Sequence, residues 1–170
     1  LYAKYGGPYV FEVRNLAGQR LFGKKYENTY EAAYMHSGLG GVISPDGTWV
    51  AILLEITDYT GEFPSMIHSI GIWMIETGQE IQQLALDPPV SALAVSPDST
   101  LLAVGTTNGT VQIWQLGSPQ PLAEMQHEAA VTALDFSPNG QLVVSASNHN
   151  SDIKVWDVSG GELVTEVNTQ

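Results

Sequence analysis

The stretch SPDSTLLAVGTTNGTVQIW, from Ser96 to Trp114, decides the fold. It opens on a tight-turn signature, because Pro97 presets φ for the second turn position. Two apolar runs of strand length follow, LLAVGT and TVQIW. Between them stand Asn108 and Gly109, a dipeptide that tolerates the positive φ of a hairpin turn. We therefore predict two antiparallel strands joined by a tight turn.

Two other stretches of the chain repeat this pattern. SPDGTWVAILLE…GIW runs from Ser44 to Trp73, and SPNGQLVVSASNHNSDIKVW runs from Ser137 to Trp156. The tryptophans that end the three stretches are 41 and 42 residues apart. A partial fourth copy has Val13 in the tryptophan position. A period of this length indicates a repeat architecture.

Each copy divides into four short strands separated by turn residues. In the last copy these are VTALDFS, QLVVSAS, DIKVWDV and LVTEV, which are rich in β-branched residues. The preceding copy reads SALAVS, LLAVGT, TVQIWQL and PLAEM. No stretch longer than ten residues has a convincing helical period, although the segment Tyr26–His36 is either a short helix or an irregular loop. Four antiparallel strands per repeat predict the blades of a β-propeller.

The closing strands resemble a known family. KVWDV, at Lys154–Val158, is similar to the full closing motif of WD-repeat propellers, whereas QIWQL and GIWMI keep the Trp and lose the Asp. His127, ten residues before Ser137, matches the family's Gly-His position, with Gln126 replacing the glycine. The resemblance covers the chain from about Val10. It implies an all-β fold, in which four-stranded antiparallel blades form an incomplete ring.

The blades divide the chain into one partial β-propeller domain, 1–170, of about 3.5 blades. Residues 1–37 are the third and fourth strands of a blade plus a connecting loop, 38–87 a blade with an insertion at 57–69, and 88–126 and 127–170 one blade each. Closed propellers need roughly four to eight blades, and the chain begins at Leu1 rather than Met. We therefore expect a fragment of a larger propeller protein. The missing blades would come from the same parent chain or from a second chain, since end blades expose apolar faces.

The resemblance also implies a hydrogen-bonded structural set within a blade. The expected members are His127, Ser145, Ser147, Asn150 and Trp156 in the last blade, with Trp114 and Trp73 as the equivalent tryptophans. Asn150 stands where the family has an Asp, six residues before Trp156. An amide there brings no charge, so its bonds should be weaker than charge-assisted ones. In the blade of Trp114 the histidine position is Leu86, so that blade should lack the set.

Composition excludes several kinds of site. The chain has no Cys, which removes disulfides, thiolate catalysis and Cys-based zinc sites. Its four histidines lack metal-ligand spacing, so we expect no metal, no cofactor and no catalytic residue. The net charge is −12, and five of the six basic residues lie in the first 25 positions. Such a surface repels phosphate backbones, so we expect neither nucleic-acid nor membrane binding. It either aids solubility or suits a basic partner.

The resemblance implies a non-catalytic scaffold for protein–protein interaction, with a partner that the sequence does not identify. Candidate contact residues are Tyr59, Phe63, Pro89, Ala130 and His149. The insertion at 57–69 is apolar for a loop, so it either contacts a partner or folds back over the blade or lengthens a hairpin. The alternatives are a propeller capping a prolyl-oligopeptidase-like hydrolase and a sensor module of a bacterial signalling protein. The lack of Cys leaves the compartment open, with the cytoplasm favoured.

Overall fold

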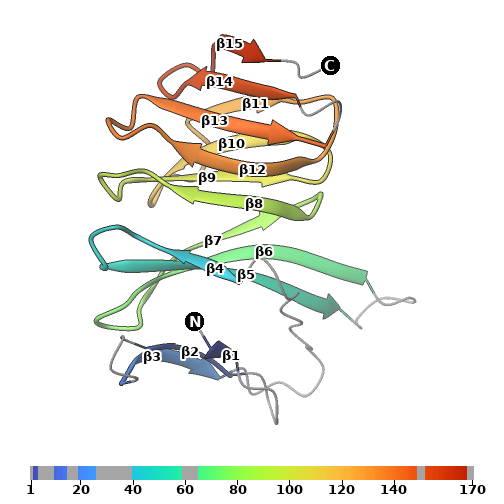
Figure 1. The fold of residues 1–170 in the computed structure, drawn as a ribbon. Coiled ribbons are helices and arrows are strands. Elements are labelled where there is room, and N and C mark those ends of the chain that lie inside the picture. Colours follow the sequence, from blue (N-terminus) through green and yellow to red (C-terminus); the bar gives the residue numbers. More distant parts are fainter. Residues whose placement is uncertain are drawn as a thin grey trace. The chain divides into compact units, whose positions relative to one another are not determined.

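The computed structural model describes residues 2–3, 10–14, 19–25, 40–58, 65–148 and 152–167. All regular secondary structure in these ranges is β-strand, and the strands form four sheets (Figure 1). Within the same ranges no helix has the length and apolar character needed to cross a membrane. The prediction of an all-β fold is thus confirmed. The segment Tyr26–His36, with its alternative of a short helix, lies outside the described residues.

The chain divides into two compact units, the first of which comprises residues 1–41 and 47–87. Its first sheet has the order β1-β2-β3 and consists of β1 (Tyr2–Ala3), β2 (Val10–Arg14) and β3 (Arg20–Lys25). The second sheet has the order β4-β5-β6-β7 and consists of β4 (Gly41–Ile43), β5 (Trp49–Asp58), β6 (Ser65–Met74) and β7 (Glu80–Leu86). Residues 42 and 43 of β4 belong to the second unit. The first sheet contains one strand more than expected, because β1 pairs with β2.

Strands β5 and β6 extend into the insertion at 57–69. They are ten residues long each, and their pairing continues through Thr57 with Met66 to Asp58 with Ser65. The described part of the insertion therefore lengthens the hairpin. Apolar residues at 66 and 67 suit a strand as well as a contact loop, which is why composition alone left both alternatives open.

The second unit comprises residues 42–46 and 88–170 and contains two four-stranded antiparallel sheets. One sheet consists of β8 (Val90–Val95), β9 (Leu101–Thr106), β10 (Thr110–Gln115) and β11 (Ala123–Gln126). The other consists of β12 (Val131–Phe136), β13 (Leu142–Ser147), β14 (Ile153–Asp157) and β15 (Leu163–Val167). In each sheet neighbouring strands along the chain are neighbours in space.

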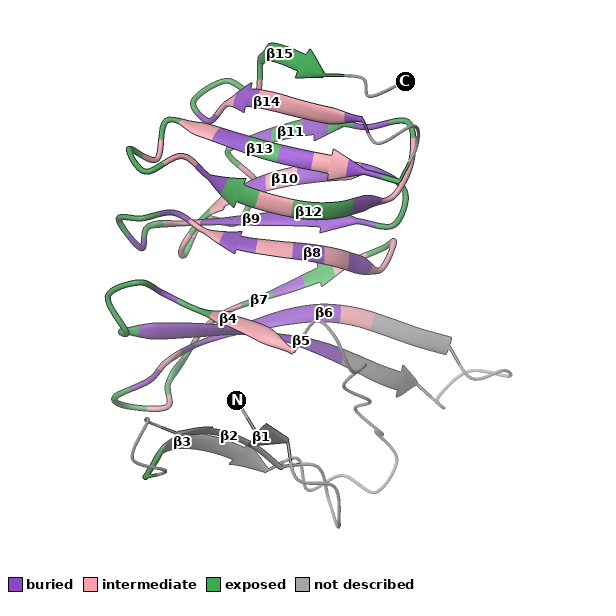
Figure 2. Cartoon of the chain, viewed as in Figure 1, coloured by how far each residue is buried: buried purple, intermediate pink, exposed green. Residues whose placement is uncertain are grey.

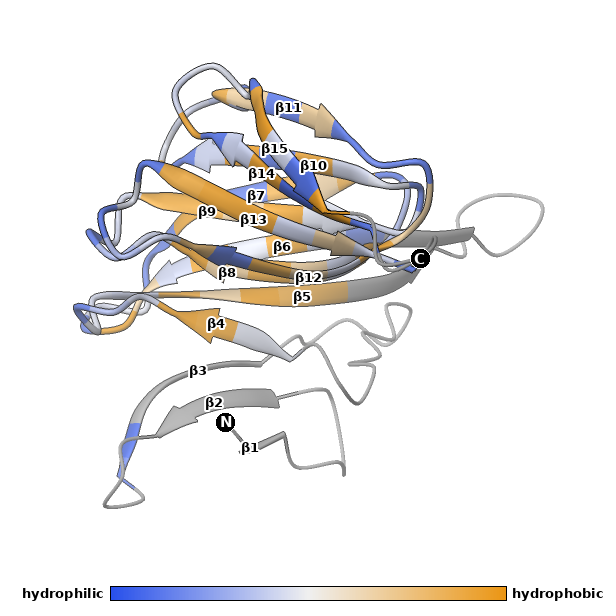
Figure 3. Cartoon of the chain, turned by 45° about the horizontal axis from the view of Figure 1, so that its top comes forward, coloured by the Kyte–Doolittle hydropathy of each residue, from blue (hydrophilic) through white to orange (hydrophobic). Residues whose placement is uncertain are grey.

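A shared core holds these two sheets together. It comprises Ala92, Ala94, Ala103, Val111, Ile113, Ala123, Met125, Val131, Phe136, Val143, Trp156 and Val158. Burial is continuous along β9, which is also strongly hydrophobic (Figures 2 and 3). The two sheets approach closely at Gly105, where an added Cβ would lie 2.6 Å from the Val131 side chain. A larger residue at this position would therefore push β12 away from β9.

The Ser-Pro-Asp/Asn turns share one hydrogen-bond pattern. The serine hydroxyl donates to the side-chain oxygen two residues on in Ser44–Asp46 (2.6 Å), Ser96–Asp98 (2.6 Å) and Ser137–Asn139 (2.7 Å). In the second and third turns the same hydroxyl accepts from the amide that starts the next strand, at Leu101 (2.9 Å) and Leu142 (3.0 Å). The repeated sequence therefore encodes a repeated local structure.

Candidate functional site

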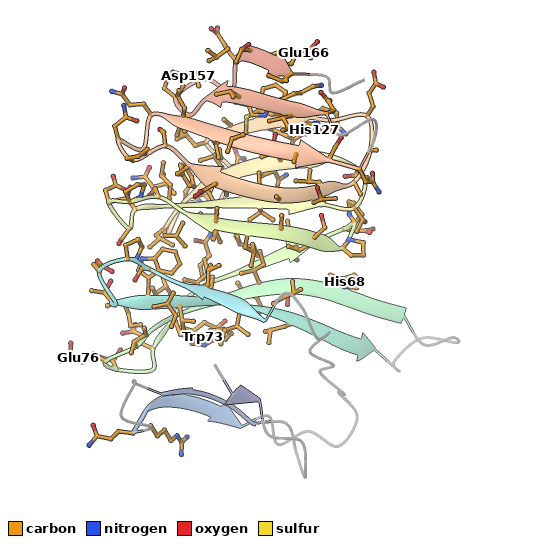
Figure 4. The ribbon with its side chains drawn as sticks, viewed as in Figure 1. His68, Trp73, Glu76, His127, Asp157 and Glu166 are labelled. Carbon is orange, nitrogen blue, oxygen red and sulfur yellow. The ribbon has the colours of Figure 1, made fainter. Side chains whose placement is uncertain are left out.

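A polar network lies inside the last sheet, and His127 is its centre (Figure 4). This histidine precedes β12, and its side chain is fully buried. Its Nε2 is 2.6 Å from Ser145 Oγ on β13, and Trp156 Nε1 on β14 donates to the same oxygen at 2.7 Å. The His127 and Trp156 rings meet edge to face, with centroids 5.9 Å apart. The network thus joins the entry to the sheet with its two central strands.

The carboxylate of this network belongs to Asp152. Its Oδ2 is 3.3 Å from His127 Nδ1 and 3.6 Å from Lys154 Nζ. Asn150, the member that the resemblance implies, lies outside the described residues. Asp152 is four residues before Trp156, whereas Asn150 is six residues before it.

The hydrogen positions follow from the partners. A neutral His127 with its proton on Nδ1 donates to Asp152, and its Nε2 accepts from the Ser145 hydroxyl. The Ser145 oxygen in turn accepts from the Trp156 indole, which can only donate. Burial lowers the pKa of His127 below its ordinary value, while the hydrogen bond to Asp152 acts in the opposite direction. A neutral imidazole is consistent with every contact in the network.

Ser145, His127 and Asp152 have the residue types of a hydrolytic triad, but the setting does not fit that chemistry. A nucleophilic serine needs an oxygen that a substrate can reach. Ser145 is 0 % exposed, and its oxygen already has two partners. The network therefore fixes the sheet internally. Within the described residues there is also no group of three or more His, Asp and Glu side chains that could hold a metal ion.

The other expected members have different surroundings. Ser147 is buried, and its amide donates to the Asp152 carbonyl at 2.9 Å. Trp114 is half-buried, and its indole donates to Gln112 Oε1 at 3.1 Å on its own strand. Trp73 is buried against Gly71, where an added Cβ would overlap the indole ring. The network of His127 and Ser145 is thus not repeated around Trp114.

A second feature is the set of loops at one end of the second unit, which we call the loop surface. It comprises residues 88–89, 106–110, 126–130 and 147–148. Pro89 O accepts from Thr107 N at 2.9 Å, and Ala130 O accepts from Asn148 N at 3.1 Å. Pro89 and Ala130 are half-buried, and these carbonyls position the neighbouring turns. Of the other expected contact residues, Tyr59, Phe63 and His149 lie outside the described residues.

Gln126, the last residue of β11, connects the β9–β10 turn with the loop before β12. Its Nε2 donates to Asn108 O at 3.0 Å and to His127 O at 2.8 Å. In addition, His127 N donates to Gly109 O at 2.9 Å. Gly109 has φ +93°, and an added Cβ would lie 2.4 Å from His127 O. Sequence reasoning missed the role of Gln126, because it read this position as the loss of a glycine.

The loop surface carries negative charge and hydrogen-bonding groups. Its exposed side chains are Thr107, Asn108, Gln126, Glu128 and Asn148. These segments contain one carboxylate and no Lys or Arg. The backbone bonds and the Gln126 amide hold them in defined positions. Such a surface can offer acceptors and a negative potential to a partner.

Comparisons with known proteins agree with this architecture. The WD repeat-containing protein SL1-17 of Schistosoma mansoni is 36 % identical over 124 residues, which are 71 % of this chain and 36 % of that protein. Small ribosomal subunit protein RACK1z of Arabidopsis thaliana is 36 % identical over 78 residues, 46 % of this chain and 23 % of that protein. The chain thus spans well under half the length of these relatives.

A solved structure shows the same fold. The crystal structure of the RRP9 WD40 repeats superposes with a TM-score of 0.60 at 23 % identity, over 82 % of this chain and 42 % of that one. Residues 54–170 match the family described as Nucleolar protein 10-like, N-terminal domain, and this segment is more than half of the chain. The chain therefore belongs to the Nucleolar protein 10-like N-terminal domain family and consists of WD-repeat β-propeller blades.

Proposed function

We propose that this chain is a non-catalytic scaffold that binds a protein partner through the loop surface. The observation that carries the proposal is that hydrogen bonds of Gln126, Gly109 and His127 hold the β9–β10 turn against the loop before β12. Binding surfaces made from loops on a rigid scaffold are common in proteins. A surface that is ordered before binding loses less conformational entropy when the partner docks.

The charge of the loop surface favours a basic partner. Glu128 is exposed, and the surface contains no Lys or Arg. A basic protein segment would gain both charge complementarity and hydrogen bonds to Asn108 and Asn148. A nucleic acid would meet like charge instead. We therefore propose a basic protein segment as the partner.

The buried network supports a scaffold rather than an enzyme. The one described Ser-His-Asp arrangement has its serine oxygen occupied by Trp156 and shielded from solvent. A rigid last sheet, stabilised by this network, keeps the loop before β12 in place. The loop surface depends on that position, since Gln126 and His127 both belong to the loop.

Charge reversal on the loop surface tests the proposal. The natural protein would be tagged and purified from its own cells, and a recovered partner would then be measured in a purified binding assay. The variant Glu128→Lys should weaken binding about tenfold or more. Glu162→Lys, in the exposed β14–β15 turn, is the control and should bind like the unchanged chain. Equal binding by Glu128→Lys, or a partner lost on ribonuclease treatment, would show that the proposal is wrong.

A further inference from the structure

Asn108 lies in the β9–β10 turn of the loop surface, and its side-chain oxygen is fully used within the chain. The oxygen Oδ1 accepts from the Thr106 hydroxyl at 2.7 Å, from Thr110 N at 3.2 Å and from the Thr110 hydroxyl at 2.9 Å. Because the backbone N–H of Thr110 can only donate, this contact assigns the oxygen and the nitrogen of the Asn108 amide. An amide oxygen has two lone pairs, so these donors leave it no capacity for a further partner.

The nitrogen of the same amide is in the opposite situation. Asn108 is exposed, and among the residues that the structure describes no acceptor bonds to its Nδ2. Asn108 is six residues before Trp114, the spacing at which the resemblance implies a bond to a histidine. The histidine position of this blade is Leu86, which cannot accept or donate a hydrogen bond through its side chain. The two N–H groups of Asn108 are therefore available to a partner.

Gln126, the other amide side chain bonded to this turn, has no such capacity. Its Nε2 donates to Asn108 O at 3.0 Å and to His127 O at 2.8 Å, and its Oε1 accepts from the Thr110 hydroxyl at 3.2 Å. The two amides thus differ in what they do: Gln126 holds the turn, and Asn108 presents two donors from a fixed position. Donors that are fixed before binding lose less conformational entropy when a partner docks.

These donors restrict how a basic segment can meet the turn. Lys and Arg side chains carry donors and no acceptor, so they cannot bond to an amide N–H. The main chain carries one carbonyl acceptor per residue. Inside a helix that carbonyl is bonded within the helix, whereas an extended segment leaves it free. A basic segment can therefore bond to Asn108 Nδ2 through its main chain where that segment is extended.

We propose that Asn108 is a specificity-determining residue of the loop surface, and that its Nδ2 donates to a main-chain carbonyl of an extended basic segment. The inference rests on the proposed function, and it adds the conformation of the partner to its charge. Glu128 attracts the cationic side chains, and Asn108 distinguishes an extended segment from a basic helix. A basic helix would satisfy the charge and leave the Asn108 donors without an acceptor at the contact, which costs binding free energy.

Asn108→Asp separates the donor from the charge. The variant keeps the oxygen that accepts from Thr106 and Thr110, so the turn should stay folded, and circular dichroism and thermal unfolding check that it does. Charge alone would make the variant bind a basic partner more tightly. Loss of the donor should instead weaken binding about fivefold or more. The measurement is the purified binding assay, with the natural protein and its recovered partner carrying a fluorophore.

Asn139→Asp is the matched control. Asn139 is exposed, precedes a glycine and accepts from Gln141 N at 3.1 Å, but it lies in the β12–β13 turn, at the other end of its sheet. The control makes the same change of charge, and it should bind at least as tightly as the unchanged chain. At high salt the loss in Glu128→Lys should shrink, because it is an effect of charge, while the loss in Asn108→Asp should persist.

The two acidic and basic substitutions also distinguish failure of this inference from failure of the proposed function. Undiminished binding by Asn108→Asp, with Glu128→Lys still weakened, would overturn the inference alone. An equal loss in Asn139→Asp, or a loss in Asn108→Asp that disappears at high salt, would do the same. Undiminished binding by Glu128→Lys would overturn the proposed function, and the inference with it.

Discussion

At the scale of single residues, His127 determines how the last sheet is held. Its ring contacts Ser145 on one side and Asp152 on the other, and its backbone bonds to Gly109 of the preceding sheet. One residue therefore connects the interior of β12–β15 with the loop surface. Because all these groups are polar and largely buried, losing one partner leaves another without a hydrogen bond.

Replacing Ser145 tests how much this network contributes to the free energy of unfolding. Ser145→Ala removes the acceptor of the Trp156 indole and the donor to His127 Nε2, and leaves both groups buried. We expect the free energy of unfolding to fall by about 2–4 kcal/mol, as measured by denaturant titration. Ser159→Ala, in the exposed β14–β15 turn, should change it by less than about 0.5 kcal/mol. Similar losses in both variants would contradict a special role for the network.

The histidine should also make stability depend on pH. Its pKa in the folded chain lies below its ordinary value of 6.5, chiefly through burial. The unfolded chain then takes up a proton first as the pH falls, so the folded state loses stability below about pH 6.5 until it is protonated too. Asp152 and Lys154 are the charged groups that face the ring. Unfolding free energies measured at pH 7.5 and 5.5 should differ more in the unchanged chain than in His127→Gln, and equal differences would contradict this account.

The residues of the network were predictable from sequence to different degrees. His127, Ser145 and Trp156 occupy positions that the repeat period and the resemblance mark out. Asp152 was not predictable, because the resemblance places this member of the network six residues before Trp156, and Asp152 is four residues before it. The same holds for Gln126, whose side-chain bonds connect segments 18 residues apart.

At the scale of elements, two turns require glycine for different reasons. Gly117 and Gly109 both have positive φ, +79° and +93°. No atom lies within 4 Å of an added Cβ at Gly117, whereas one at Gly109 would meet the carbonyl oxygens of His127 and Ala129. Gly117→Ala should therefore cost about 1 kcal/mol for the left-handed backbone alone.

Gly109→Ala should cost more, about 3 kcal/mol or more, because the loop before β12 has to move as well. Thermal and denaturant unfolding of the two variants would measure the difference. The two glycines have similar backbone conformations. The difference between the two losses of stability therefore reports how closely the loop before β12 contacts Gly109. Equal costs would mean that the loop shifts freely, and that the loop surface is less rigid than its hydrogen bonds indicate.

The tryptophans that close the repeats should differ in their contribution to stability. Trp156 is 6 % exposed and bonds to Ser145, while Trp114 is half-buried and bonds within its own strand. Trp156→Ala should lower the free energy of unfolding by about 3–5 kcal/mol. Trp114→Ala should cost roughly half of that, since less apolar surface is lost from the core. Equal losses in denaturant titrations would contradict the difference in burial.

Most strands of the second unit were predictable, since each has its own apolar run and a turn signature on either side. The predicted run LLAVGT is β9, and LVTEV is β15. The lengthened hairpin of β5 and β6 was not predictable in the same way, because pairing across the insertion depends on partners rather than on local pattern. Strand β1 is only two residues long and is defined by its pairing with β2.

At the scale of the whole molecule, the stability of each sheet depends on its contact with the neighbouring sheet. Each sheet of the second unit buries its apolar side chains against the other, as Val131 does against Gly105. In repeat proteins of this kind stability is close to a sum of unit terms and nearest-neighbour contacts. Unfolding of one sheet therefore exposes a face of the next. A substitution that destabilises one sheet should thus also destabilise the sheet that packs against it.

Hydrogen exchange on Trp156→Ala would measure this spread. The amides of β13 and β14 should lose protection first, because the indole belongs to their core. The amides of β9 and β10 should lose protection as well, since Ala103 and Ile113 are covered by the sheet that Trp156 stabilises. Trp114→Ala should affect β9 and β10 directly. If β9 and β10 keep full protection in Trp156→Ala while β13 and β14 exchange freely, the two sheets unfold independently, and their shared core contributes little to cooperativity.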